Sequence, residues 1–179
     1  MSTRSRIAII LKDEDKGELF FPKENLLYGK LYHENKGVEG VIDLPMLHST
    51  AFEKNVVSIY HHWDGYPTGV GITLMEHYND YEKVRNLMLF GDASSINVDS
   101  ATDDISFYNY WRNEDWNAVH PHQNNDIKEL KDSVRNGWEE YCYLYQPNEN
   151  GEYEWYVASV GKKMTFRRLE EVLEKETKD

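Results

Sequence analysis

The stretch from His61 to Gly71 holds the densest group of side chains that can do chemistry. Imidazole and carboxylate groups such as His61 and Asp64 can bind a polar ligand or move a proton. Gly69 and Gly71 lie where a helix is expected to begin, and free backbone N–H groups at a helix start suit a phosphate. The spacing matches neither GxxxxGK[ST] nor a complete GxGxxG. One hypothesis is a small-ligand pocket that sequesters or hydrolyses a phosphorylated nucleotide signal, with His61, Asp64, Gly69 and Gly71 as its binding residues.

The same stretch also has a purely structural interpretation. Trp63, Tyr66 and Pro67 can pack a tight corner between a strand and a helix, and the Asp64 carboxylate can accept hydrogen bonds from turn amides. The sequence leaves both interpretations open.

Metal binding and nucleophilic catalysis have less support. His61 and His62 are adjacent on an expected strand and point to opposite faces, so a metal site would have to combine His61, Asp64 and His120. Cys142 lies within an aromatic strand, where a thiol is expected to be buried rather than reactive, and no serine lies in a GxSxG motif. We therefore assign no catalytic residue, metal ligand or cofactor and favour a non-enzymatic function.

Acidic residues flank many of the aromatic ones. The chain carries 32 Asp and Glu against 20 Lys and Arg, a net charge of −12, together with 13 tyrosines and 5 tryptophans. Tyrosine and tryptophan are favoured in protein interfaces, and an anionic patch suits a basic partner. This predicts a partner-binding surface formed by Glu114, Asp115, Trp116, Glu139, Glu140, Glu152 and Glu154. The alternative is that the excess acid only keeps the protein soluble.

Hydrophobic periodicity predicts the elements that position these residues. Strands are expected at 7–11, 55–62, 106–112, 141–145 and 153–157, the last two forming a hairpin. Helices are expected at 69–78, 81–90, 127–136 and from 165 onward, begun by Thr68, Asp80, Asp126 and Thr165, with a loop at 94–104. We expect a single α+β domain over residues 1–179, with a largely antiparallel sheet of about five strands and helices packed mainly on one face. Residues 18–54 are expected to be an insertion of loops and short strands.

Composition also bounds the setting of the protein. The single cysteine excludes an internal disulfide framework, and no apolar run approaches the ~18 residues that span a bilayer. The N-terminal segment has too few apolar residues for a signal peptide, so the cytoplasm is expected. The charge of −12 argues against direct binding to nucleic acid or to an anionic membrane, because both require clustered Lys and Arg.

Several motifs together resemble a family of small phage and prophage proteins. They are the N-terminal Met-Ser-Thr-Arg-Ser, the Tyr-His-His-Trp-Asp-Gly-Tyr-Pro motif at 60–67, and the segments Gly69–Gly71, His77–Asp80 and Gly91–Ser95. The resemblance covers the start of the chain and residues 55–95 well, extends more loosely to 111–116 and 141–155, and leaves out 18–54. It implies a viral origin and a location in the host cytoplasm, and it assigns no catalytic residue.

The acidic aromatic composition and the resemblance lead to one preferred hypothesis. The protein is expected to be a non-enzymatic inhibitor of a host defence system of the CRISPR or restriction type. It would occupy the basic surface of a host defence or nucleic-acid-handling complex, by direct protein contact or by mimicry of nucleic acid. A structural or regulatory protein that acts as a homo-oligomer is a further possibility.

Overall fold

The computed structural model of the chain describes residues 2–23, 26–27, 48–98 and 103–177. Most of the expected insertion at 18–54 lies outside these residues. Its described ends form the short strands β2 (Leu19–Phe20) and β3 (Thr50–Ala51), which pair with each other.

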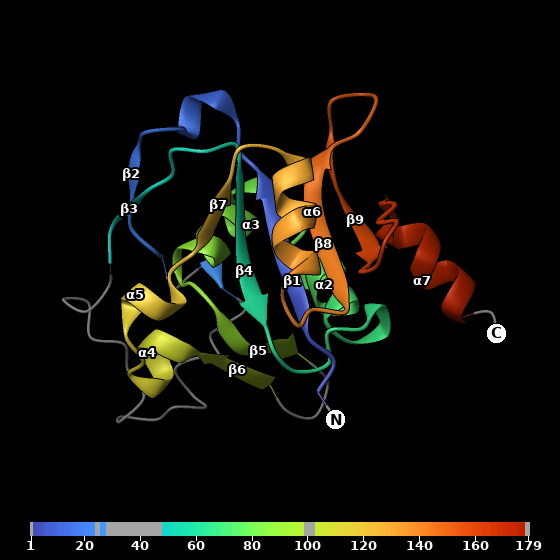
Figure 1. Ribbon diagram of the computed structural model, residues 1–179, viewed down its shortest axis with the longest axis horizontal. Helices are drawn as coiled ribbons and strands as arrows, with labels where there is room; N and C mark the ends of the chain where they lie inside the picture. Colours follow the sequence, from blue (N-terminus) through green and yellow to red (C-terminus); the bar gives the residue numbers. More distant parts are fainter. Residues whose placement is uncertain (1, 24–25, 28–47, 99–102, 178–179) are drawn as a thin grey trace.

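A mixed sheet occupies the centre of the molecule (Figure 1). Its strands are β1 (Ser5–Ile10), β4 (Val56–His61), β5 (Ala93–Val98), β6 (Asp103–Phe107), β7 (His122–Asn124), β8 (Tyr141–Pro147), β9 (Tyr153–Ser159) and β10 (Arg167–Arg168). Their order is β10-β9-β8-β1-β4-β5-β6, with β7 beside β4, and only the β1–β8 and β4–β5 neighbours are parallel. The expected α+β class is confirmed, but within the described residues the sheet has 8 strands, not about five.

Two expected elements differ because tertiary pairing outweighs local composition. The small polar residues from Ser94 onward were expected to form a loop, yet they form β5, which pairs with β6 and buries Ser94 and Ser95. The strand expected at 106–112 ends at Phe107, and its second half is the helix α4 (Tyr108–Arg112). Strand propensity measures how a side chain fits its neighbours, so a sequence window without those neighbours misjudges both segments.

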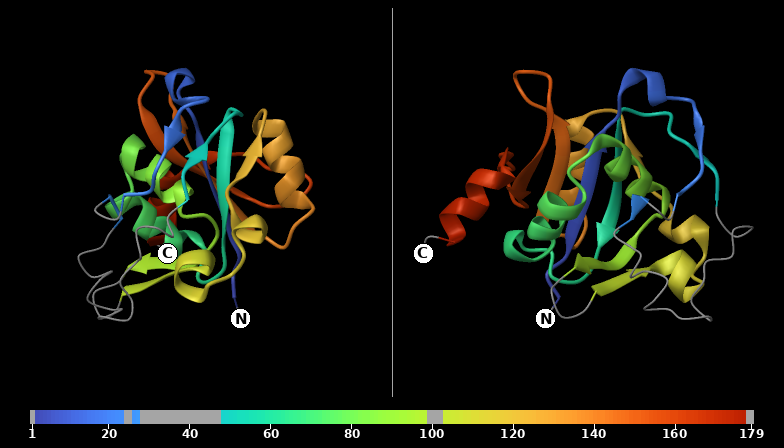
Figure 2. Two further views of the ribbon diagram at one scale, coloured as in Figure 1. Left: turned by 90° about the vertical axis from the view of Figure 1, so that its left-hand side faces the viewer. Right: turned by 180° about the vertical axis from the view of Figure 1, so that it is seen from behind.

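Helices lie on both faces of the sheet (Figure 2). The inner face is covered by the π-helical turn η5 (Pro67–Gly71) and by α2 (Ile72–His77), α3 (Tyr81–Leu89) and α7 (Leu169–Thr177). The outer face is covered by α6 (Ile127–Arg135), which buries Leu130 and Val134 against Ala8 and Leu144. A short helix, α5 (Trp116–Val119), follows α4. The expectation of helices mainly on one face therefore holds for all the sheet-covering helices except α6.

Two of the four expected helix caps are present. The carboxylates of Asp80 and Asp126 accept hydrogen bonds from first-turn amides of α3 and α6. The expected cap by Thr68 is wrong, because η5 begins at Pro67 after Tyr66 and has no side-chain cap. The expected cap by Thr165 is also wrong, because Arg167 continues the sheet edge opposite Val157 and α7 begins only at Leu169.

The pairing register of β1 with β4 decides which side chains share a face. Ser5 lies opposite His61 and Arg6 lies opposite Tyr60. Because successive side chains of a strand alternate, His61 points to the inner face and Tyr60 to the outer face.

A buried ion pair lies on the outer face next to Tyr60. The Arg6 guanidinium donates to Glu139 Oε1 from Nη2 at 2.8 Å and from Nε at 3.1 Å, and it also donates to Ser58 Oγ at 3.2 Å. The two side chains are only 6% and 3% exposed. Glu139 was expected to contact a partner, but it neutralises an arginine that β1 places inside the fold. It is therefore not part of a binding surface.

We predict opposite stability effects for two neighbouring glutamates. Glu139→Ala leaves the Arg6 guanidinium buried without its counter-charge and is expected to lower the free energy of unfolding by about 3–5 kcal/mol. Glu140→Ala, at an exposed position, is expected to change it by less than about 0.5 kcal/mol. Urea unfolding monitored by circular dichroism measures both, and equal effects would contradict the assignment of Glu139 to the interior.

Candidate functional site

His61 is a core residue rather than a ligand-binding one. The Ile96 N–H donates to its Nε2 at 3.1 Å, so the ring proton is on Nδ1, which lies 3.4 Å from Ser5 Oγ. Burial, with a smaller contribution from His62, lowers the pKa of His61 to about 3. Both ring nitrogens are used inside the inner core and the side chain is fully buried, so the expectation that His61 binds a ligand is wrong.

The turn that follows His61 does not offer a phosphate cradle. The Gly69 N–H donates to the Tyr66 carbonyl at 2.9 Å and the Val70 N–H donates to the Asp64 carbonyl at 2.8 Å. A Cβ at Gly69 would clash with that same Asp64 carbonyl, and Gly71 is buried close to Leu169, so both glycines serve packing. The expected anion site at the helix start is therefore wrong.

A cavity of about 340 Å³ lies beside this turn, but its chemistry is acidic. Asp64 and Glu76 line it, and none of its described lining residues is a lysine or an arginine. Asp64 itself has a left-handed backbone, with φ of 53°, and its carboxylate accepts from the Tyr66 hydroxyl at 3.3 Å. The structural interpretation is only partly right as well, because Trp63 is 42% exposed and Tyr66 39% exposed.

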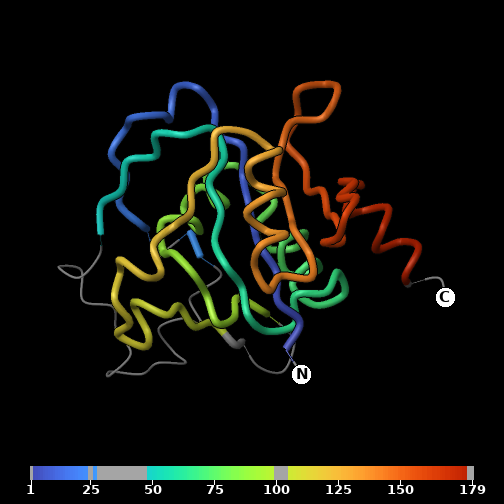
Figure 3. Tube along the Cα trace, viewed as in Figure 1, coloured from blue at the N-terminus to red at the C-terminus, as the bar shows by residue number. Residues whose placement is uncertain are grey.

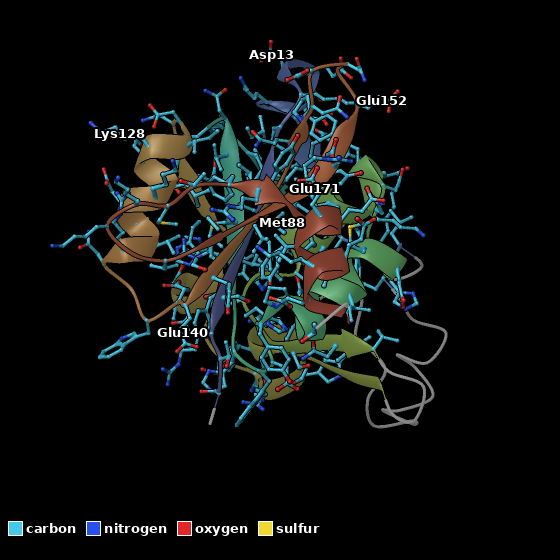
Figure 4. All side chains as sticks on the ribbon, turned by 90° about the vertical axis from the view of Figure 1, so that its right-hand side faces the viewer. Asp13, Met88, Lys128, Glu140, Glu152 and Glu171 are labelled. Atoms are coloured by element: carbon cyan, nitrogen blue, oxygen red, sulfur yellow. The ribbon has the colours of Figure 1, made fainter. Side chains whose placement is uncertain are left out.

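The expected acidic aromatic surface is divided among separate parts of the molecule. Glu152 lies at the tip of the β8–β9 hairpin and Glu140 lies in the segment before β8, far from it (Figure 4). Glu154 is held by Arg168 at 2.7 Å, and Asp115 caps α5 by accepting from the Asn117 N–H at 3.0 Å.

The remaining members of that set lie at the α4–α5 corner. The Trp116 ring stacks on His48 with a centroid distance of 4.5 Å, so its indole is partly covered. Glu114 is exposed beside it in the sequence. Of the predicted set, Glu114, Asp115, Glu140 and Glu152 are exposed and take part in no ion pair among the described residues, and they do not form one continuous surface.

A polar aromatic cluster lies on the outer face beyond the ion pair of Arg6. It consists of Arg4, Tyr60, His62, Tyr108 and Arg112, and we call it the Arg4–Arg112 cluster. The Tyr60 hydroxyl lies 2.7 Å from His62 Nδ1, and Arg4 lies near enough to the same hydroxyl to lower its pKa. When the hydroxyl donates to His62 Nδ1, the ring proton is on Nε2, where it can be donated to a ligand.

The N-terminal segment positions Arg4. Continuing the β1–β4 register by one residue sets Arg4 opposite His62. The backbone there is held on both sides, because the Gly65 N–H donates to the Thr3 carbonyl and the Glu140 N–H donates to the Arg4 carbonyl, each at 2.8 Å. Figure 3 shows the turn after β4 and the segment before β8 passing beside the N-terminal end of the trace.

Helix α4 brings the second guanidinium from the other side of β4. Arg112 Nη2 donates to Ser94 Oγ at 3.1 Å, and its guanidinium carbon lies 5.3 Å from the centroid of the Tyr108 ring. The helix is anchored at its start by the Tyr108 N–H, which donates to the Asp92 carbonyl at 3.1 Å. It ends at Asn113, whose left-handed φ of 57° turns the chain away.

Asp92 holds β4 at the point where the strand paired with it on the side away from β1 changes from β7 to β5. Residues 56–58 of β4 pair with β7, and His61 pairs with β5. The Tyr60 N–H falls between these strands and donates to Asp92 Oδ1 at 2.8 Å. The same oxygen lies 3.5 Å from His122 Nε2. The buried Asp92 carboxylate therefore accepts a hydrogen bond from the backbone of the sheet and forms no ion pair with Arg4 or Arg112.

The charges of the cluster favour an anion. Partial burial, followed by the positive charges of Arg4 and Arg112, lowers the pKa of His62. Burial is the main cause that raises the pKa of Tyr60 and of Tyr108. Glu139 adds to the rise at Tyr60, and Glu114 and Asp92 add to it at Tyr108. Among the described residues, neither arginine takes part in an ion pair. At neutral pH the cluster thus presents two guanidinium groups, two protonated phenols and a neutral imidazole.

One signal in the sequence pointed to this cluster. The alternation along residues 55–62 predicts that Tyr60 and His62 share a face of their strand. Arg4 and Arg112 join them only through the sheet order, because Arg112 lies far from them in the chain. His62, the neighbour of the residue first considered, is the histidine that belongs to this outer-face cluster.

We predict that His61 makes the folded state sensitive to mild acid. Its pKa of about 3 in the fold lies below its ordinary value of 6.5, so below pH 6.5 the unfolded chain takes up a proton that the folded chain does not. The stability from the neutral ring is complete above pH 6.5 and falls by up to about 1.4 kcal/mol per pH unit toward pH 3. Urea unfolding at pH 7.5, 6.0 and 5.0 should show a smaller decline for His61→Gln than for the unaltered protein. Equal declines would contradict a buried, neutral His61.

Comparison of the chain with protein-family models, curated proteins and solved structures finds no match. None of the described helices has the length and apolar composition needed to cross a membrane. Within the described part of the chain, no three His, Cys, Asp or Glu side chains are placed to hold a metal ion, so His61, Asp64 and His120 do not converge. The geometry of the Arg4–Arg112 cluster is therefore the basis of the functional assignment.

Proposed function

We propose that the protein binds a phosphate-bearing anion at the Arg4–Arg112 cluster. One observation carries the proposal: two guanidinium groups without ion-pair partners among the described residues, one half-buried and one exposed, flank the half-buried Tyr60 and His62 on the outer face. Each guanidinium presents several N–H donors in a planar fork that matches two oxygens of a phosphate. The hydroxyl of Tyr108 and the Nε2–H of His62 supply further donors.

The overall charge restricts the size of the ligand. A chain of net charge −12 repels an extended polyanion, whereas a small anion can be held by the local positive charges of Arg4 and Arg112. The ligand is therefore still a phosphorylated small molecule, as considered from the sequence, but its binding site is a different one. His62 takes the place of His61 as the histidine of the site, and the two arginines take the place of the backbone N–H groups at the helix start as the groups that bind phosphate. No residue is assigned a catalytic role.

Inhibition of a host defence complex is the second candidate function. The net charge of −12 and the 81% exposed Trp138, which lies close to the exposed Glu140 in the chain, favour a protein partner. Such a partner would have to contact exposed residues such as Glu114 or Glu140. The two functions are compatible, because a phage protein that sequesters a phosphorylated signal would also neutralise a host system.

We predict that replacement of either arginine abolishes most anion binding. Arg4→Gln and Arg112→Gln each remove charge-assisted hydrogen bonds and are expected to weaken inorganic phosphate binding about 10-fold or more, measured by isothermal titration calorimetry at low salt. Lys128→Gln, an equal charge change at an exposed position on α6 (Figure 4), should leave the affinity unchanged. Absence of phosphate binding by the unaltered protein would overturn the proposal.

A carboxylate variant separates the two candidate functions. Glu114 acts on Tyr108 from the rim of the cluster, so Glu114→Gln should strengthen phosphate binding about 2-fold by removing a like charge. Mimicry of nucleic acid predicts instead that the same change weakens capture of a basic partner. Weaker phosphate binding in Glu114→Gln would count against the anion site.

We also predict that anion affinity rises in mild acid. The groups that face His62 are Arg4, Arg112, Tyr60 and Trp63, and partial burial, followed by the charges of the two arginines, holds its pKa below the ordinary 6.5. A bound anion reverses this repulsion and raises the pKa of His62, so binding takes up a proton. Sulfate, which keeps its charge over this range, should bind more tightly as the pH falls from 8.0 to 5.5. The slope should disappear in His62→Gln, and a slope that persists there would exclude His62 from the site.

A further inference from the structure

We infer that the anion is a nucleotide whose base stacks on Trp63 while Arg4 and Arg112 hold its phosphate. This inference rests on the proposed function and deepens it, because it adds an aromatic subsite to the anion site.

Trp63 presents an indole ring that the fold does not bury. The ring is 42% exposed, and it meets the His62 ring edge-on at a centroid distance of 4.8 Å and an angle of 88°. Its backbone is held at both ends, since the Trp63 N–H donates to the Ser94 carbonyl at 3.0 Å and its carbonyl accepts from Asn97 Nδ2 at 2.9 Å. The exposed indole therefore extends from a fixed backbone and packs edge-on against His62, and we call it the platform.

The order of the indole, the imidazole and the guanidinium groups matches the order of base, sugar and phosphate in a nucleotide. His62 touches Trp63 on one side and Tyr60, with Arg4, on the other, so one imidazole ring separates the indole from the charged groups. In a nucleotide, a sugar ring separates the base from the phosphate in the same way. Aromatic stacking combined with arginine contacts is a common mode of binding nucleotide bases and phosphates.

The surroundings favour a single nucleotide over a polymer. The exposed Asp64 follows Trp63 directly, and the exposed Glu140 lies next to the Arg4 backbone. Both carboxylates would repel the next phosphates of a chain, and an extended nucleic acid requires clustered lysines and arginines along its path. The site therefore fits a mononucleotide.

The test compares ligands that share a phosphate and differ in the base. Inorganic phosphate, ribose 5-phosphate, AMP, GMP and UMP are titrated into the full-length protein by calorimetry and by tryptophan fluorescence. At least one mononucleotide is expected to bind about 10-fold more tightly than ribose 5-phosphate and to quench fluorescence, because stacking on an indole contributes that much.

Variants at two tryptophans locate the stacking contact. Trp63→Ala should reduce nucleotide affinity to that of ribose 5-phosphate in the same variant, while Trp63→Phe should keep most of the preference for a nucleotide. Trp138→Ala, which removes an indole that is 81% exposed, should leave nucleotide binding unchanged and serves as the matched control.

The outcomes separate this inference from the proposed function. Equal affinities for nucleotides, ribose 5-phosphate and inorganic phosphate, all lost in Arg112→Gln, would overturn the nucleotide and keep the anion site. A nucleotide preference that survives Trp63→Ala would overturn the stacking contact. Tighter binding of a 5′-phosphorylated thymidine tetramer than of any mononucleotide would overturn the single-nucleotide ligand, and no binding of any phosphate would overturn both proposals.

Discussion

The antiparallel pairing of β1 with β4 is the constraint on which the rest of the structure depends. With Ser5 opposite His61 and Arg6 opposite Tyr60, one histidine enters the inner core and the next lies on the outer face. A slip of β4 by one residue would turn His61 to the outer face and bring its neighbours Tyr60 and His62 into the inner core. The strong burial of Ile7 and Ile59 on the inner face opposes such a slip.

Along the outer face the same two strands pass from an apolar to a polar environment. Beneath α6 they present Ala8 and Val56, which join the second core. Arg6 comes next and is neutralised by Glu139, so its charge is not available to a ligand. Arg4, one alternation further, lies beyond that carboxylate and keeps its charge for another group. Two arginines on one face of one chain segment thus have different roles because only one is covered.

Local chemistry predicted the elements whose signals are contained in a few residues. Asp80 and Asp126 cap α3 and α6, and the hairpin of β8 and β9 forms as its turn residues indicate. Prediction failed where distant strands decide the outcome. Ser94 and Ser95 lie in a buried strand because β5 pairs with β4 on one side and with β6 on the other. The polar sequence of this segment does not itself indicate that pairing.

By itself the sequence determined the α+β class, the burial of Cys142 and the shared face of Tyr60 and His62, because each depends on local periodicity or composition. Only the tertiary structure decided which charged and aromatic groups meet. It placed Glu139 against Arg6, divided the acidic residues among separate surfaces, and brought Arg4 and Arg112 to either side of β4. Such meetings depend on strand order and register, and those are set by long-range pairing and burial that no single segment encodes.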